Sequence, residues 1–381
     1  MDTTSDVIVV GGGVIGLSVA DRLAREGLGV TLLERGLCGR EASWASAGIL
    51  KPSNPNRRGP MQQIQRAGLH TFPAYCADLR ERTGIDPEYA RCGSLELLFN
   101  DQRYRMALSE QRASARQTVA DGPGDDLEWQ VLEPVDAAEL EPGISRDCLG
   151  VLLCRSAAQV RNPRLLKALQ AACRTGGVRI EEHSPVTRLV IDADRIRGVE
   201  TETRRFAARW AVLAAGAWSS QIDPRVGSAI PTYPVRGQVV LLDASDLPGA
   251  RFSHIVDRKG CYLVRRREGL VLIGATVEHE SGFDRRNTPG GVTQLMEDAL
   301  TLLPGLAGAG VAGMWSGLRP GTPDQRPYLG PLPGVEGLVV ATGHYRTGLA
   351  LAPVTAEIVR DLLVCGRSER DLSRCRPGRT T

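Results

Sequence analysis

Three glycines near the N-terminus have the spacing of a phosphate-binding turn. They form the pattern Gly11-x-Gly13-x-x-Gly16, and an acid, Glu34, follows eighteen residues later. In such a unit the first glycine permits a tight turn, the second lets the backbone approach a pyrophosphate, and the third lets a helix pack on a strand. The helix N-terminus offers free N–H groups to the phosphates, and the acid accepts the ribose hydroxyls. We therefore expect an adenine dinucleotide at this end of the chain.

The elements required around these glycines are also present. A β-branched run at residues 7–10 predicts a strand, apolar periodicity predicts a helix from the turn to about residue 26, and residues 30–33 predict a second strand that ends on the acid. A glycine-rich turn alone is common, but strand, turn, helix, strand and acid fall here in register. The alternative of an ordinary βαβ turn is therefore disfavoured.

Three later segments favour FAD over NAD as the dinucleotide. Residues 42–49 form a small-residue loop that would let a large flat ring approach the backbone, and the strand at 211–216 ends on Gly216. The turn at 343–348 leads into a helix that is predicted from about residue 351. Its N-terminus could stabilise negative charge on a reduced flavin.

Composition indicates an ordinary globular enzyme. The 381 residues are 42% hydrophobic and 24% charged, and the net charge of +3 comes from dispersed arginines, which predicts no nucleic-acid partner. The nine cysteines are odd in number and contain no CxxC pair, which favours free thiols in a reducing compartment over disulfides or a metal site. With no signal-like segment or membrane-spanning run, we expect a cytoplasmic protein that does not contact a membrane.

The order of the predicted elements indicates an α/β fold in which a Rossmann-like dinucleotide domain is interrupted. An antiparallel or mixed sheet is predicted within residues 233–277, and the C-terminal strand and helix return to the first domain. We expect a discontinuous FAD-binding domain, a substrate-binding domain inserted into it, and a flexible tail. The FAD-binding domain would comprise residues 1–85, 148–230 and 322–375. The substrate-binding domain would comprise residues 86–147 and 231–321, and the tail residues 376–381.

The chain resembles the D-amino-acid-oxidase superfamily of FAD-dependent oxidoreductases over nearly its whole length, and within it the glycine oxidase branch of the thiazole pathway. The motifs that carry the resemblance are Val9-Val10-Gly-Gly-Gly-Val-Ile-Gly16, Glu34-Arg35, Ala47-Gly48-Ile49, Pro234-Val-Arg-Gly-Gln238, Gly274-Ala-Thr276, Gly317-Leu-Arg-Pro-Gly321 with Asp324 and Pro327, and Gly343-His-Tyr-Arg-Thr-Gly-Leu-Ala-Leu-Ala-Pro353.

The resemblance implies which residues hold FAD. Together with the glycine motif, the residues expected at the cofactor are Gly11, Gly13, Val14, Ile15, Gly16, Glu34, Arg35, Ala42, Ser43, Ala47, Gly48, Ile49, Val186, Gly216, His344, Tyr345, Arg346, Thr347, Gly348 and Leu349. The last six would contact the isoalloxazine ring.

The resemblance also implies a substrate-binding set of Arg319, Tyr262 and Arg346. A guanidinium matches a carboxylate in bidentate fashion, so Arg319 would fix an amino acid with its Cα over the flavin, and Tyr262 would add a hydroxyl. The alternatives are a packing ion pair between Arg319 and Asp324, a core position for Tyr262, and a bracing role for Arg346. No general base is required if the substrate amine is neutral, and we expect His344 to order its turn.

Two positions depart from the glycine oxidase pattern. Gly260 stands where a histidine is frequent, and Val277 replaces a methionine near the pocket. Both changes remove side-chain volume, so we expect a pocket that admits more than glycine.

The sequence therefore predicts an FAD-dependent oxidase of a small amino acid: glycine first, then sarcosine or small D-amino acids, with dioxygen as acceptor and hydrogen peroxide as product. The branch implies an imino product used in thiamine thiazole synthesis. One alternative is a dehydrogenase of D-amino acids or 2-hydroxy acids that passes electrons to a quinone or carrier. A non-catalytic flavin subunit and a tRNA-modifying flavoprotein are less well supported. The sequence leaves open homo-oligomerisation and whether residues 51–60 form a lid.

Overall fold

The structure is a computed structural model that describes residues 3–121 and 128–379. Its first sheet is built on five parallel strands, β1 (Thr3–Val10), β2 (Val30–Leu33), β9 (Arg179–Glu181), β12 (Arg205–Leu213) and β19 (Leu338–Thr342). The antiparallel strands β10 (Val186–Asp192), β11 (Arg195–Thr201) and β18 (Tyr328–Pro331) extend this sheet. The central strands are buried on both faces, as their unbroken apolar runs require.

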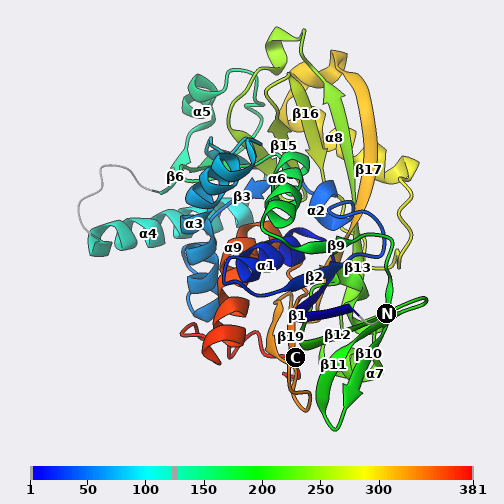
Figure 1. The fold of residues 1–381 in the computed structure, drawn as a ribbon. Helices are drawn as coiled ribbons and strands as arrows, with labels where there is room; N and C mark the ends of the chain where they lie inside the picture. The colour runs from blue at the N-terminus through cyan, green and yellow to red at the C-terminus, as the bar shows by residue number, and fades with distance from the viewer. Residues whose placement is uncertain (1–2, 122–127, 380–381) are drawn as a thin grey trace.

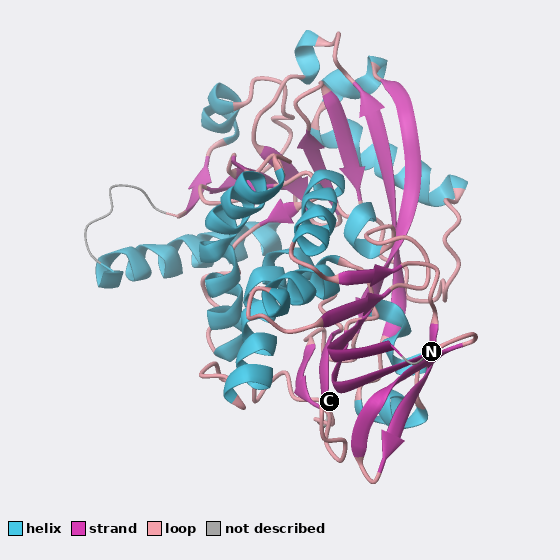
Figure 2. Cartoon of the chain, in the orientation of Figure 1, coloured by secondary structure: helices cyan, strands magenta, loops and turns pink. Residues whose placement is uncertain are grey.

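Helices cover one face of the first sheet. They are α1 (Val14–Ala24), α3 (Pro60–Thr83), α6 (Asn162–Thr175) and α9 (Gly348–Arg360), and they pack against one another around α1 (Figures 1 and 2). The red C-terminal helix α9 lies beside the blue N-terminal helix α1 in Figure 1. The first and last parts of the chain therefore build the same layer.

The second sheet has the strand order β17-β13-β16-β15-β14-β5-β7-β6. Two long antiparallel strands, β13 (Tyr233–Asp243) and β17 (Gly310–Gly321), form one edge and descend toward the first sheet in Figure 1. Helix α8 (Pro289–Leu302) contributes Leu295, Ala299 and Leu302 to the core of this part. The other strands are β5 (Ser94–Leu98), β6 (Trp129–Leu132), β7 (Gly150–Cys154), β14 (Ile255–Arg258), β15 (Cys261–Arg265) and β16 (Leu270–Gly274).

Short elements complete the chain. They are α2 (Ala42–Ala45), β3 (Ile49–Leu50), β4 (Ala90–Arg91), α4 (Asp101–Asp121), α5 (Pro134–Leu140), β8 (Ala158–Gln159), η1 (Gly216–Gln221), α7 (Pro224–Ala229), η2 (Pro248–Ala250), η3 (Pro304–Gly308) and η4 (Asp361–Cys365). Strands β3, β8 and β4 form a small third sheet.

These sheets confirm the predicted fold class, an α/β dinucleotide fold that carries a second, mixed sheet. The division into domains stays a proposal, and two of its details need adjustment. Strand β7 pairs with β5 and β6, so the segment that begins at residue 148 starts in the second sheet. Within the expected tail, Arg379 pairs with Asp324 at 2.7 Å, which ties this residue to the first part.

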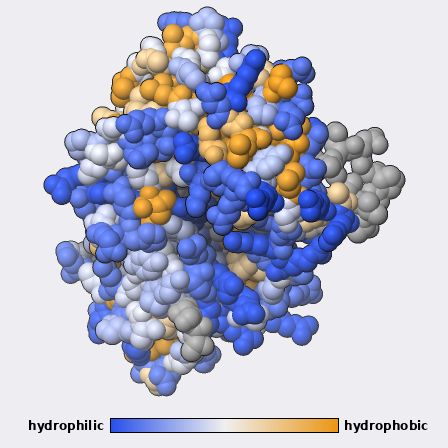
Figure 3. Space-filling model, turned by 180° about the vertical axis from the view of Figure 1, so that it is seen from behind, coloured by the Kyte–Doolittle hydropathy of each residue, from blue (hydrophilic) through white to orange (hydrophobic). Residues whose placement is uncertain are grey.

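Apolar side chains gather toward the top of the face seen in Figure 3, at the height of the second sheet in Figure 1, and most of the remaining surface is hydrophilic. Within the described residues, no helix has the length and apolar character needed to cross a membrane.

Candidate cofactor and substrate site

The glycine turn brings strand β1 and helix α1 into direct contact. A Cβ added at Gly16 would lie 1.9 Å from the carbonyl oxygen of Gly11, so only glycine allows this approach, and Gly11 itself has a φ of +109°. Helix α1 begins at Val14, directly after Gly13, so its N-terminus lies at the carboxyl edge of the sheet. This is the geometry in which a helix N-terminus receives a phosphate.

The acid at the end of β2 is held in a fixed orientation. The buried carboxylate of Glu34 accepts a hydrogen bond from the backbone N–H of Gly12 at 2.7 Å and another from that of Gly36 at 2.9 Å. The next residue, Arg35, lies with its guanidinium 3.5 Å from the centre of the Trp218 ring. These residues form one end of a large cavity.

That cavity has a volume of about 920 Å³ and runs from the glycine turn to the C-terminal turn. This size suits a large ligand, since small-molecule sites occupy roughly 300–1,000 Å³. Among its lining residues are eighteen of the expected cofactor residues: Gly11, Gly13, Val14, Ile15, Glu34, Arg35, Ala42, Ser43, Ala47, Gly48, Ile49, Val186, Gly216, His344, Tyr345, Arg346, Gly348 and Leu349. Gly16 and Thr347 lie outside the lining; Gly16 packs against β1, and the Thr347 hydroxyl donates to the carbonyl of His344 at 2.9 Å.

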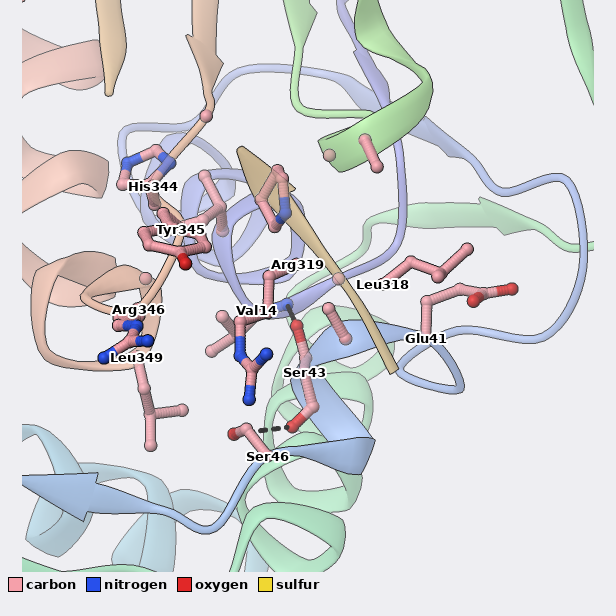
Figure 4. Close-up of a pocket in the computed structure, with 18 of the residues that line it drawn as sticks. Val14, Glu41, Ser43, Ser46, Leu318, Arg319, His344, Tyr345, Arg346 and Leu349 are labelled. Carbon is pink, nitrogen blue, oxygen red and sulfur yellow. Dashed lines mark hydrogen bonds between the residues drawn. The ribbon is translucent and has the colours of Figure 1, made fainter. Parts of the chain in front are cut away.

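The small-residue loop forms one wall of the cavity, as Figure 4 shows for Ser43 and Ser46. The Ser43 hydroxyl accepts the backbone N–H of Val14 at 3.0 Å, which joins the loop to the start of α1. The buried amide of Asn162 donates to the carbonyls of Ser43 and Ser46 at 2.9 and 2.7 Å. A Cβ on Gly48 would meet the Val160 carbonyl at 1.9 Å, so the loop can sit this close to β8 only with glycine there.

The C-terminal turn forms the opposite wall (Figure 4). His344 is buried, and its Nε2 lies 3.1 Å from the Thr355 hydroxyl on α9. Burial lowers the pKa of His344 to about 3, so the ring is neutral near pH 7. These contacts support the expected structural role, in which His344 orders the turn from which α9 starts.

Arg319 and Tyr262 lie close together in the wall formed by the second sheet. Both line the cavity, and the Tyr262 side chain interacts with the Arg319 guanidinium. The guanidinium donates to the carbonyls of Thr276 at 2.9 Å and Arg236 at 3.4 Å. Burial lowers the pKa of Arg319 and raises that of Tyr262.

The alternative ion pair between Arg319 and Asp324 is absent from the structure. Asp324 instead binds Arg379, and across residues 3–121 and 128–379 no acidic side chain forms an ion pair with Arg319. A Cβ at Gly237 would lie within 2.4 Å of the guanidinium, so that glycine makes room for it. The result is a partly buried cation that faces a cavity and forms no ion pair with a described acidic residue.

Of the other substrate-side expectations, Arg346 and Gly260 line the cavity, whereas Val277 does not. Val277 is 38% exposed, because the chain turns away from the cavity after Ala275. Glu278, which follows Val277, pairs with Arg236 in two backbone hydrogen bonds of 3.0 Å. The expected gain of pocket volume at Val277 is therefore wrong. At Gly260 the expected gain of pocket volume stays a prediction, and nothing lies within 4 Å of a Cβ added there.

The sequence did not predict several residues that line the cavity, including the charged residues Lys51, Glu96, Arg103 and Asp257. Lys51 falls in residues 51–60, for which the sequence left open a role as a lid, and no local pattern indicates that its side chain turns toward the cavity. Asp257 could have been found by folding the chain into a hairpin around Lys259-Gly260, because that hairpin places Asp257 opposite Tyr262.

The residues present fit FAD. A glycine turn at the start of α1, an oriented ribose-type carboxylate, a small-residue wall and a helix N-terminus at the far end surround one cavity of suitable size. Gly13, Glu34 and the start of α1 would hold the adenosine and phosphates, and the 343–349 turn would border the flavin.

Comparisons with known proteins agree with this geometry. The profile of the family "FAD dependent oxidoreductase" (DAO) matches residues 6–362. The chain is 38% identical over 361 residues to the glycine oxidase of Pseudomonas aeruginosa, covering 94% of each protein. It is 32% identical over 372 residues to the bifunctional protein ThiO/ThiG of Nostoc sp., covering 97% of this chain and 54% of that one. The crystal structure of glycine oxidase from Geobacillus kaustophilus superposes with a TM-score of 0.91 at 32% identity, over 100% of both chains.

Proposed function

Given that the chain belongs to the DAO family of FAD dependent oxidoreductases and is an FAD-dependent amino-acid oxidase, we propose that its substrates are glycine first, then sarcosine and small D-amino acids. The observation that carries this proposal is Arg319, a partly buried guanidinium without an acidic partner in the described residues, in the wall of the cavity that also contains the dinucleotide turn. An amino-acid carboxylate would supply the missing anion.

In the proposed reaction the amino acid loses its Cα hydrogen and two electrons, and the imine that forms takes up water to give a 2-oxo acid and ammonia, or an amine from a secondary substrate. FAD supplies the two-electron chemistry when bound, with dioxygen reduced to hydrogen peroxide. Arg319 and Tyr262 hold the carboxylate, which fixes the position of Cα, and this alignment accounts for much of the rate gain. His344 is neutral and bonded to Thr355, so we assign it no proton transfer.

We favour dioxygen over a quinone or protein carrier as electron acceptor because similar proteins from Pseudomonas aeruginosa and Geobacillus kaustophilus are named glycine oxidases. Hydrogen peroxide formed in air at the rate of substrate loss would support this choice. We further propose a role in supplying an imine for thiazole synthesis, and a cytoplasmic location. The location is supported by nine cysteines that are all free in the structure.

The test is anaerobic mixing of the holoprotein with single amino acids, followed by the loss of flavin absorbance near about 450 nm. Arg319→Ala should keep its bound FAD and lower kcat/KM for glycine by at least about 30-fold, because truncating one partner of a desolvated charge pair costs on the order of 2–5 kcal/mol. Arg319→Lys should recover part of the loss, since an ammonium keeps the charge without the planar fork.

Arg267→Ala is the matched control, because Arg267 is exposed and its ion pair with Asp86 spans 3.6 Å. It should behave as the native protein does. If Arg319→Ala still oxidises carboxylated substrates at the native rate, the carboxylate is held elsewhere. If no small amino acid bleaches the native flavin, the proposed substrates are wrong.

A further inference from the structure

The cavity continues past Tyr262 into an end lined by charged side chains that the oxidation of glycine does not need. Lys51, Glu96, Arg103 and Asp257 all line this end. They come from the segment after β3, from strand β5, from helix α4 and from strand β14, so distant parts of the chain converge here.

The register of the second sheet fixes where this end lies. Tyr262 on β15 is paired with Asp257 on β14, and Asp257 is paired with Glu96 on β5. Directly paired residues in neighbouring strands point to the same face of a sheet. Because strands are spaced by roughly 4.8 Å, the polar end begins one strand beyond the expected carboxylate-binding tyrosine.

Lys51 has fewer acidic partners than Arg103, the other cation that lies among these acidic side chains. Arg103 is held by Glu96, with two contacts of 2.6 Å, and also by Glu110. Lys51 has one acidic partner, Asp257 Oδ2 at 2.9 Å, and an ammonium can donate three hydrogen bonds.

The ion pair that Asp257 forms with Lys51 leaves the Asp257 carboxylate in an unfavourable environment. The other carboxylate oxygen, Asp257 Oδ1, is buried and has no hydrogen-bond partner. Burial raises the pKa of Asp257 above its ordinary value, so the charged form of this carboxyl is disfavoured there. A ligand anion that reached Lys51 could therefore compete with Asp257 for it.

The chain also leaves space for such a ligand. Gly260, at the tip of the β14–β15 hairpin, lines the cavity, and nothing lies within 4 Å of a Cβ added there. The adjacent Lys259 lines the cavity, is exposed, and forms no ion pair with any described residue. The sequence contains three lysines, and two of them are at this end.

We propose that Lys51 is the centre of a second subsite, which binds a second carboxylate of the substrate while Arg319 and Tyr262 bind the first. This inference rests on the proposed function and narrows it from small amino acids to amino dicarboxylates. The second carboxylate could be carried on the amine nitrogen, as in N-(carboxymethyl)glycine, or on Cα, as in D-aspartate. Lys259 would attract the dianion at the entrance.

The test compares each dicarboxylate with a neutral partner in which methyl replaces the second carboxylate. The pairs are N-(carboxymethyl)glycine with N-ethylglycine, and D-aspartate with D-2-aminobutyrate. We expect the native holoenzyme to favour the dicarboxylate of at least one pair by tenfold or more in kcat/KM, and the preferred pair tells which atom carries the second group. Equal efficiency within both pairs would overturn the subsite and leave the oxidase assignment intact.

Two variants separate a ligand-binding role from a structural one. Lys51→Met should reduce the dicarboxylate preference at least tenfold, whereas Asp257→Asn should increase it, because it removes the carboxylate that competes for Lys51. If the pair served only to hold the fold, both variants would change both substrates alike. Each preference is a ratio within one protein, so partial loss of folding or of FAD cancels. Lys167→Met on α6, at an exposed position, is the matched control and should keep the native preference.

A binding measurement makes the test independent of turnover. Calorimetric titration of the holoprotein should show succinate binding at least tenfold more tightly than butyrate, and Lys51→Met should remove this difference. Equal affinities in the native protein would overturn the subsite. If neither member of any pair bleaches the flavin while succinate still binds preferentially, the subsite stands and the proposed reaction fails.

Discussion

At the scale of single residues, His344 shows how burial decides the chemistry of a titratable group. Its ring lies in the wall of the cavity, 3% exposed, and its Nε2 is 3.1 Å from the Thr355 hydroxyl. The low dielectric around it disfavours the imidazolium, which lowers the pKa to about 3 from the ordinary value of 6.5. A histidine next to a cofactor invites a catalytic assignment, and here its environment argues for a neutral ring that orders a turn.

This pKa predicts an acid-sensitive stability. Between pH 6.5 and about 3 the unfolded chain binds a proton at His344 that the folded chain does not, so the free energy of unfolding falls as the pH falls. At pH 5 the loss from this residue should be about 2 kcal/mol relative to pH 7, from 1.36 kcal/mol per pH unit. Thermal unfolding of the holoprotein at both pH values, with and without His344→Asn, measures it.

In that comparison the native protein should lose more stability between pH 7 and pH 5 than His344→Asn does. His70→Asn, at an exposed position on α3, is the control and should follow the native protein. An identical loss in native and His344→Asn proteins would mean that His344 is protonated in the folded state.

At the scale of elements, the close contact between β1 and α1 depends on the absence of a side chain at Gly16. An alanine at Gly16 would place its Cβ 1.9 Å from the Gly11 carbonyl, so strand and helix would have to separate and the turn between them would move. We expect Gly16→Ala to lose most of its FAD, seen as a lower ratio of flavin to protein absorbance. Gly290→Ala, near the start of helix α8 with open space around it, should keep a native ratio. A fully loaded Gly16→Ala would show that the turn tolerates the separation.

The elements also show what local sequence can and cannot reveal. The helix expected from the glycine turn to about residue 26 is observed as α1, Val14–Ala24, because its apolar period and the glycine turn before it are local features. Asp257 can be placed from the sequence by its hairpin pairing with Tyr262, whereas Lys51 reaches the cavity beside a distant ion-pair partner and has no local signal. Val277 was expected at the pocket but lies outside its lining. Two backbone hydrogen bonds between the next residue, Glu278, and Arg236 hold this part of the chain away from the cavity.

At the scale of the whole molecule, the cavity is shared by the two main sheets, and side chains from both parts meet beside it. Trp218 on η1 lies between Arg35, 3.5 Å above its ring, and Phe283, whose ring centre is 5.2 Å away. Glu41 bridges Arg35 at 2.7 Å and Arg285 at 3.1 Å. Phe283 and Arg285 belong to the connection between β16 and α8, whereas the other three line the cavity. This cluster therefore ties the second part of the chain to the wall of the dinucleotide site.

Because the cluster joins parts that are far apart in sequence, loosening it should speed the departure of the cofactor rather than unfold either sheet. Phe283→Ala removes the outer ring of the stack, and aromatic pairs contribute about 0.5–1.5 kcal/mol, so we expect FAD to dissociate about three- to tenfold faster. The rise of flavin fluorescence after dilution measures that rate. Arg286→Ala is the neighbouring control, since Arg286 is exposed and pairs with Asp284. Release at the native rate from Phe283→Ala would mean that the glycine turn and the 343–349 turn retain FAD without help from this cluster.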